Sequence, residues 1–370
     1  MTPPEQWVLQ FCHGYDGPFL DCARQYAALF EGTPYKVCTV YLTGAPNDAV
    51  VRESASDDVR FLDYGSAEVR GLKLGAMRAL RRLVRDRNFR FCIAHRFKPT
   101  YIALLATKLP VIGVNHAFGV YQRRSRRLLA KLFRQRLALL GVSDSVRDDI
   151  RACLPDWPPE RIETLYNRID VEAVQVEQLD RPAAREALGL PQSAWIIGNA
   201  GRLHPDKDQA TLIRGFALAA PQLPPASVLA IMGSGRLEAE LKRLASELGV
   251  TDRVRFLGQV PQGRRYFKAF DLFALTSDHE PFGMVLLEAM AAGVPTLCSD
   301  CGGGREVIAD ERCLFQLGQP QGLAKVLLRL SLQEADPALV EPQRQRLASV
   351  FSDTAARTRF WSLPMVRQLG

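Results

Sequence analysis

Two glutamates eight residues apart, Glu280 and Glu288, have the spacing that says most about chemistry in this sequence. A proline in the first turn favours a helix, so Pro281 predicts a helix start that separates the two backbones by roughly 12 Å. A hydrolytic carboxyl pair needs about 5 to 9.5 Å, so the spacing favours two contacts to one extended ligand. The N–H groups near Phe282 and Gly283 would bind an anion. We expect a polyhydroxyl ligand carrying phosphate; two ordinary acids at a helix start are the alternative.

Two cations lie on a second loop, Gly201 to Lys207, which follows a predicted strand. Arg202 can fork onto phosphate oxygens and Lys207 adds a mobile charge, which suits a diphosphate whose charge grows as a bond breaks. An ordinary surface loop is the alternative. Asp206 and Asp208 complete a D-x-D pattern, but the cation between them opposes a divalent metal and either acid can start a helix. We therefore expect no metal.

Glycines and histidines also follow predicted strands. Gly14 and Gly17 allow close approach of a ligand, but their pattern, H-G-x-x-G-P, is not the G-x-G-x-x-G of dinucleotide-binding folds, which disfavours hydride transfer. His116, after the apolar run 111–114, is the histidine most suitably placed for a ligand, although a structural hydrogen-bonding role is the alternative. Cys298 and Cys301 form a lone C-x-x-C, which favours reduced thiols over a zinc or redox site.

The elements that must position these loops are short apolar runs alternating with helical patterns, which predict parallel sheets in an α/β fold. The expected strands are 7–11, 37–42, 89–95, 111–114, 139–142, 195–200, 227–232, 254–257, 272–275 and 296–297. A polar stretch with Pro182 and Pro191 follows Asp170, which predicts domains over 1–170 and 171–353. Two doubly wound domains would face each other across a cleft at the carboxyl ends of their strands, where the loops described above fall.

Charge is unevenly distributed. Through Asp170 there are 26 Lys and Arg against 18 Asp and Glu, whereas the remainder has 22 of each. Residues 123–140 mix cations with Leu and Phe at helical spacing, which predicts a basic amphipathic helix that binds anionic lipid or packs on the core with a solvated face. No nucleic-acid-binding module is recognisable. Without a long apolar run or an export signal, we expect a cytoplasmic protein with no membrane span.

Several motifs occur in the order typical of one family, and the chain resembles glycosyltransferase family 4, whose GT-B architecture has two Rossmann-like domains. The matching stretches are Phe256-Leu257-Gly258, Phe270-Asp271-Leu272-Phe273, the Glu280 segment, Gly293-Val294-Pro295 and Gly302-Gly303-Gly304-Arg305-Glu306. Ser143 resembles the start of the family's serine-led helix, and residues 167–170 its N-G-I-D. Arg168 and Arg305 depart from the usual pattern. The resemblance also implies that a C-terminal helix, about 354–370, crosses back to the first domain.

The resemblance implies roles for individual residues. Glu280 would contact sugar hydroxyls and Glu288 the nucleotide ribose, with Arg202 and Lys207 on the donor diphosphate. His116 would lie near the anomeric carbon. The implied catalytic set is Glu280, Arg202, Lys207 and His116. The implied donor-binding set is Gly17, Gly201, Arg202, Lys207, Gly233, Gly258, Val260, Glu280, Phe282, Gly283, Met284, Val285 and Glu288. No separate cofactor is implied, because the donor is itself the nucleotide sugar.

The resemblance implies metal-independent transfer of a hexose or 6-deoxyhexose from a UDP-, dTDP- or GDP-linked sugar to a saccharide hydroxyl. The acceptor would be lipopolysaccharide core or another lipid-linked glycan at the inner membrane surface, and the family's usual outcome is retention. If the donor is a β-linked 6-deoxy sugar and the product is α, inversion would need a base, with His116 or Asp16 as candidates. A nucleotide-sugar 2-epimerase of the same fold and a non-catalytic lipid-surface or sugar-binding module are the alternatives.

Overall fold

The computed structural model describes residues 5–65, 67–332 and 337–369, and the chain divides into two compact units. The first unit consists of Met1–Asn167 together with Asp353–Gly370, and the second of Arg168–Ser352. The predicted boundary, after Asp170, lies three residues beyond this division.

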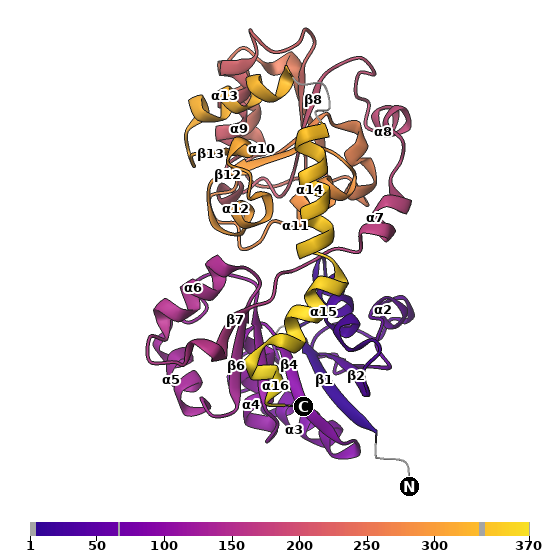
Figure 1. The fold of residues 1–370 in the computed structure, drawn as a ribbon, viewed down its shortest axis with the longest axis vertical. Helices are drawn as coiled ribbons and strands as arrows, with labels where there is room; N and C mark the ends of the chain where they lie inside the picture. Colours follow the sequence, from indigo (N-terminus) through magenta and orange to yellow (C-terminus); the bar gives the residue numbers. More distant parts are fainter. Residues whose placement is uncertain (1–4, 66, 333–336, 370) are drawn as a thin grey trace. The chain divides into compact units, whose positions relative to one another are not determined.

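The first unit is built on a parallel sheet whose described strands follow the order β3-β2-β1-β4-β5-β6-β7 (Figure 1). The strands are β1 (Gln6–Cys12), β2 (Tyr35–Tyr41), β3 (Asp58–Phe61), β4 (Phe89–His95), β5 (Val111–Asn115), β6 (Leu137–Gly141) and β7 (Ile162–Thr164). The helices of this unit before the C-terminal segment are α1 (Phe19–Ala27), α2 (Asp48–Glu53), α3 (Leu74–Leu83), α4 (Phe97–Ala106), α5 (Arg124–Leu132) and α6 (Asp144–Cys153).

The second unit has a parallel sheet with the described strand order β10-β9-β8-β11-β12-β13. The strands are β8 (Ile196–Ala200), β9 (Val228–Met232), β10 (Val254–Gly258), β11 (Leu272–Leu275), β12 (Thr296–Ser299) and β13 (Leu314–Phe315). The helices are α7 (Val171–Glu177), α8 (Arg181–Ala187), α9 (Gln209–Ala219), α10 (Glu238–Glu247), α11 (Met284–Ala291), α12 (Gly302–Ile308), α13 (Pro320–Ser331) and α14 (Pro337–Val350). Together the two sheets confirm the predicted α/β class with doubly wound domains.

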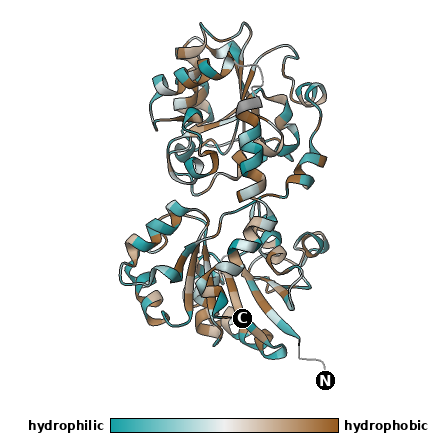
Figure 2. Cartoon of the chain, in the orientation of Figure 1, coloured by the Kyte–Doolittle hydropathy of each residue, from teal (hydrophilic) through white to brown (hydrophobic). Residues whose placement is uncertain are grey.

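Apolar strands form the core of each unit, and Figure 2 shows brown strands inside the first unit with much of the teal on the helices outside. Val8, Leu9 and Phe11 of β1 have no exposed surface. Gln10 is equally buried, and its amide donates to Thr39 Oγ1 over 3.0 Å, which satisfies a polar group inside the sheet. Nearly continuous apolar strands are typical of parallel sheets covered on both faces.

The C-terminal segment returns to the first unit, as the resemblance implied. Helices α15 (Asp353–Ser362) and α16 (Pro364–Arg367), yellow in Figure 1, belong to this unit. The Phe360 ring lies 5.7 Å from that of Phe30, and Trp361 Nε1 donates to the carbonyl oxygen of Leu29 over 2.9 Å. Buried aromatic contacts of this kind fix the return of the chain.

Two expected helices differ from prediction. The helix expected from Pro281 begins at Met284, because Gly283 takes the N-cap position with φ +97°. The basic helix ends at Leu132, and the continuation expected as far as residue 140 is wrong because β6 begins at Leu137. Leu137 fits a helical spacing, but β6 is a buried strand between β5 and β7, so sheet pairing prevails over the local pattern. Among the described helices, none has the length and apolarity needed to span a bilayer.

Candidate donor and acceptor sites

The centre of the site in the second unit is an ion pair between loops that follow β8 and β11. Lys207 Nζ donates to Glu280 Oε2 over 2.7 Å, and Ser277 Oγ donates to the same oxygen over 3.0 Å. The side chains of Lys207 and Glu280 are 19% and 10% exposed, so the ion pair is largely desolvated. Two donors on Oε2 hold the carboxylate in one orientation, and among the described residues no hydrogen bond is made to Oε1. A ligand hydroxyl can therefore donate to Oε1 without breaking the pair.

Hydrogen bonds to backbone carbonyl oxygens tie the surrounding loops together. Thr276 Oγ1 donates to the carbonyl oxygen of Lys207 over 3.0 Å, and Ser299 Oγ donates to that of Ser277 over 2.6 Å. The amide of Gly303 donates to the carbonyl oxygen of Glu280 over 2.8 Å. The ends of β8, β11 and β12 thus hold Lys207 and Glu280 in place before any ligand binds, which is how a binding site limits the entropy it loses.

The start of α11 lies one turn later than the sequence predicted. Because Gly283 is the N-cap, the amides available at the helix start are those of Met284 and Val285 rather than those near Phe282. Phe282 is only 2% exposed, and its ring lies 5.7 Å from that of Phe351. Glu280 stands outside the helix, so the separation of roughly 12 Å, which assumed a continuous helix to Glu288, does not apply. Glu288 is half-buried in α11.

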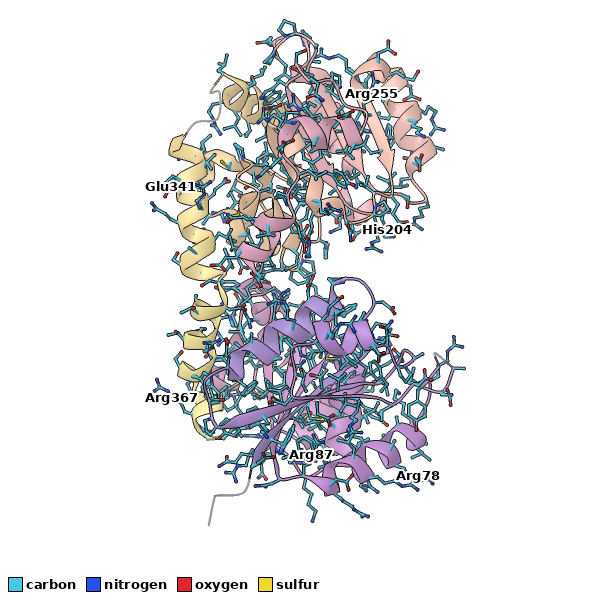
Figure 3. The ribbon with its side chains drawn as sticks, turned by 90° about the vertical axis from the view of Figure 1, so that its right-hand side faces the viewer. Arg78, Arg87, His204, Arg255, Glu341 and Arg367 are labelled. Atoms are coloured by element: carbon cyan, nitrogen blue, oxygen red, sulfur yellow. The ribbon has the colours of Figure 1, made fainter. Side chains whose placement is uncertain are left out.

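Arg202 and Lys207 have different environments on the loop after β8. The Arg202 side chain is 72% exposed, with Nη2 3.4 Å from Asp206 Oδ2. His204, labelled in Figure 3, bonds to Oδ1 of the same carboxylate. Asp208 begins α9, since its Oδ1 accepts from the amide of Thr211 over 3.2 Å. The aspartates of the D-x-D pattern therefore orient the loop and cap a helix, and the described residues contain no cluster of three metal-ligating side chains.

Three predicted glycines meet at the ends of β8, β9 and β10. A Cβ on Gly233 would lie 1.9 Å from the carbonyl oxygen of Gly201, and the φ of Gly233 is +132°. The Gly233 amide donates to the carbonyl oxygen of Gly258 over 2.7 Å. Val260 lies just beyond β10 and is half-buried. Only glycine permits this approach, so Gly233 is where the loops from three strands can pack together.

In the first unit, His116 follows β5 and is held by aromatic neighbours. Its Nε2 lies 3.3 Å from Nδ1 of His95, and its ring stands edge-on to Phe19 with centroids 6.1 Å apart. Burial, and then the charge of Arg96, lower the pKa of His116 to about 4. The ring is thus neutral near pH 7 and suits hydrogen bonding better than proton abstraction. Gly17 is exposed with φ +57°.

The sequence missed two features of these sites. Ser277 gives no motif, and only its position after β11 beside Glu280 could have suggested it. Arg96 lies between an apolar strand and a helix and belongs to no sequence motif. Its unusual backbone conformation is visible only in the structure. Ser143 was expected to begin a helix, and its Oγ accepts from the amide of Val146 over 3.1 Å at the start of α6.

Comparison with known proteins identifies both units. The family model described as Glycosyltransferase Family 4 matches residues 30–173, and the one described as Glycosyl transferases group 1 matches residues 180–348. The chain is 33% identical over 213 residues to the lipopolysaccharide core biosynthesis glycosyltransferase LpsD of Rhizobium meliloti, covering 56% of this chain and 58% of that protein. It is 34% identical over 198 residues to a D-inositol 3-phosphate glycosyltransferase of Thermomonospora curvata, covering 50% and 44%. The chain spans about half the length of the curated relatives it matches.

Solved structures share the fold over nearly the whole chain. A glycosyltransferase from Rickettsia africae superposes with a TM-score of 0.81 at 14% identity, covering 99% of this chain and 98% of that one. Anabaena HepE, in complex with UDP and glucose, has a TM-score of 0.76 at 18% identity, covering 95% and 97%. With family models matching each of its two units, the chain belongs to glycosyltransferase family 4 and has the GT-B fold.

Proposed function

We propose that this protein transfers a hexosyl unit, a hexose or 6-deoxyhexose, from a nucleotide diphosphate sugar to a saccharide hydroxyl. The observation that carries the proposal is the Lys207–Glu280 pair with Ser277, which presents a cation and an oriented carboxylate side by side. A nucleotide sugar carries the two matching groups, a diphosphate and a set of hydroxyls, in adjacent positions. The UDP and glucose present in the Anabaena HepE structure support this donor class.

The proposed chemistry needs no nucleophile from the protein. Arg202 and two remaining N–H donors of Lys207 would stabilise the charge that develops on the leaving diphosphate, with the first amides of α11 beside them. Oε1 of Glu280 would accept from sugar hydroxyls, and Glu288 would bind the ribose. In the retaining reaction the acceptor hydroxyl attacks the anomeric carbon from the face that the diphosphate leaves. The departing phosphate oxygen then takes the hydroxyl proton. Metal independence and the absence of a further cofactor are part of this proposal.

A lipid-linked acceptor, such as lipopolysaccharide core, is the acceptor class we propose, at the cytoplasmic face of the inner membrane. The name of LpsD and the basic surface of the first unit support it. On α5, Leu128 and Leu132 are 70% and 73% exposed, one helical turn apart, and cations flank them. The exposed cations are Arg123, Arg124, Lys131 and Arg134. Exposed leucines among arginines fit the boundary between headgroups and acyl chains better than a solvated helix face.

Vesicle binding tests the membrane part of the proposal. The full chain should sediment with vesicles of phosphatidylglycerol and phosphatidylethanolamine, and added salt should weaken the binding. The double variant Leu128→Ser, Leu132→Ser should lose vesicle binding. Leu218 is a 50% exposed leucine of the second unit, and Leu218→Ser should leave vesicle binding unchanged. Equal binding by all three proteins would contradict a role for α5.

Donor binding and product structure test the transfer reaction. The chain is tested in a thermal-shift panel of UDP, GDP, dTDP and ADP and their sugars. The nucleotide and nucleotide sugar of one base should raise the melting temperature, because a ligand that binds only the folded chain stabilises it. No shift from any nucleotide would refute the donor site. With the selected donor and a saccharide acceptor, NMR of the product should give retention at the anomeric carbon. An epimerised nucleotide sugar formed without acceptor would instead support the 2-epimerase alternative.

A further inference from the structure

Arg96 has a backbone conformation that side chains other than glycine rarely adopt. Its φ of +74° and ψ of 164° lie in a region populated almost only by glycine. The residue connects the end of β4 to the start of α4, at the carboxyl edge of the first sheet. Glycine would make the same turn without strain. An arginine at this position therefore lowers the stability of the fold unless its side chain has a use.

The strained peptide is held on both sides. The Arg96 amide donates to the carbonyl oxygen of Val114 in β5 over 2.9 Å. Its own carbonyl oxygen accepts from Thr100 Oγ1 over 3.0 Å and from the Thr100 amide over 3.3 Å. These bonds join the residue to the neighbouring strand and to the first turn of α4. The conformation thus belongs to the fold and fixes the direction in which the side chain leaves the backbone.

The side chain reaches the group of rings around His116. The Arg96 guanidinium lies 4.6 Å from the ring centroid of Phe19, the same ring that contacts His116. Over the part of the chain that the structure describes, it has no hydrogen-bond acceptor and no carboxylate within ion-pair distance, and the residue is exposed to solvent. A guanidinium over an aromatic face keeps its N–H donors in its own plane, where they can fork onto two oxygens of an anion.

Further cations lie near Arg96 without acidic partners. Lys98 is in the first turn of α4, and Lys73 Nζ lies 4.9 Å from the ring centroid of Tyr101 in the same helix. Neither lysine has a carboxylate within ion-pair distance among the described residues. Burial, followed by the charge of Lys98, lowers the pKa of Lys73, as expected for cations that lack a counter-ion. Acids at this edge include Asp16, exposed on the loop after β1, and Asp149, which accepts from the amide of Gly119 over 2.8 Å.

We propose that Arg96, assisted by Lys98, binds an oxyanion carried by the acceptor, a phosphate monoester or a sugar carboxylate, beside His116. This inference rests on the proposed transferase function and specifies its acceptor as an anionic saccharide. The strained backbone aims the guanidinium, the Phe19 ring supports it, and the oxyanion supplies the missing counter-charge. Phosphate and carboxylate each present two oxygens that can accept the two parallel N–H bonds of a guanidinium.

Sugar probes and three substitutions test the subsite in the full chain. Glucose 6-phosphate and glucuronate serve as the two oxyanion probes, and glucose is the neutral control, each titrated calorimetrically. We expect one or both anionic sugars to bind at least tenfold more tightly than glucose. Arg96→Gln should remove this preference. Arg96→Ala and Arg96→Gly should also remove it, but only Arg96→Gly should raise the melting temperature, because glycine alone relieves the backbone.

A second position separates strain relief from binding. Ala226 has φ +60°, so Ala226→Gly should raise the melting temperature in the same way while leaving the sugar titrations unchanged. The inference is overturned if no anionic sugar is preferred by the wild type, or if Arg96→Gln retains the preference. The UDP thermal shift distinguishes this failure from failure of the proposed function. A UDP or other nucleotide shift without anion preference refutes the subsite alone, whereas loss of both refutes the donor site as well.

Discussion

The Lys207–Glu280 pair makes the sharpest prediction, because one carboxylate serves both the fold and the ligand. At 2.7 Å and an effective dielectric constant of about 20, the attraction is on the order of 6 kcal/mol. Desolvation of both ions offsets most of it, so the net contribution is small. Removing one partner is different, because it leaves a charge that is still 80 to 90% shielded from water. We expect Glu280→Gln or Lys207→Met to lower the free energy of unfolding by about 1.5 to 3 kcal/mol each, the range for losing a hydrogen bond to a charged group. This is below the roughly 3 to 5 kcal/mol of a fully buried pair, because both side chains keep some contact with water.

A double-mutant cycle measures this coupling by urea unfolding of the ligand-free chain. The double variant should lose at least about 1 kcal/mol less unfolding free energy than the two single variants lose together, because with both groups replaced no unpaired charge is left. Lys242 and Glu238 on α10 provide a matched control at the same 2.7 Å, with side chains 54% and 38% exposed. Their coupling should be no more than about 0.5 kcal/mol. Equal coupling in the two pairs would refute the reasoning from burial.

The same Glu280→Gln variant separates the structural role from the ligand role. Loss of a charge-assisted hydrogen bond from a sugar hydroxyl costs about 1.5 to 3 kcal/mol, or roughly 10- to 150-fold in affinity for the nucleotide sugar. Affinity for the nucleoside diphosphate alone should stay equal or rise several-fold, because a negative charge beside the phosphates has gone. An equal loss of both affinities would mean that Glu280 acts only by holding Lys207.

Two further predictions concern the loops and the histidines. Gly233→Ala should lower the free energy of unfolding by about 2 to 4 kcal/mol in a urea titration, because its Cβ would lie 1.9 Å from the Gly201 carbonyl oxygen. Gly249 has φ +69°, and a Cβ added there would meet no atom within 4 Å. Gly249→Ala should therefore lower the free energy of unfolding by only about 1 to 2 kcal/mol. Folded His116 has a pKa of about 4 and an unfolded histidine one near 6.5, so between these pH values the unfolded chain binds more protons. The melting temperature should therefore fall as pH falls from 6.5 to 4, and His116→Gln should make this dependence shallower; an unchanged slope would contradict the neutral ring.

The strands that the sequence predicted are those with strong apolar runs. Each predicted strand occurs within two residues of its expected bounds, because a buried parallel strand is apolar on both faces and reads clearly. Strands β3, β7 and β13 were missed. They lie at the outer ends of the two sheets, and β13 has only two residues. An outer strand pairs on one side only and tolerates polar residues, so its pattern is weak.

The candidate site was predictable as a set of loops but not as a set of contacts. Strand ends place Arg202, Lys207 and Glu280 on neighbouring loops, and this much follows from alternating elements. The ion pair itself depends on a loop that turns before α11, where Pro281 suggested a helix but Gly283 provided the N-cap. A positive φ is a property of the folded backbone, so neither this turn nor the strain at Arg96 could be inferred from residue types.

The geometry of the ion pair bears on how the protein would distinguish a nucleotide sugar from a free nucleotide. With Lys207 and Ser277 both on Oε2, the Glu280 carboxylate keeps its orientation when no donor is present. A nucleoside diphosphate that reaches Lys207 meets this carboxylate as a like charge, and nothing on such a ligand offsets the repulsion. An attached sugar brings hydroxyl donors for Oε1, which turns the same carboxylate from a penalty into a contact. The carboxylate thus disfavours a free nucleoside diphosphate and adds a contact to a nucleotide sugar, so it acts on both competing ligands.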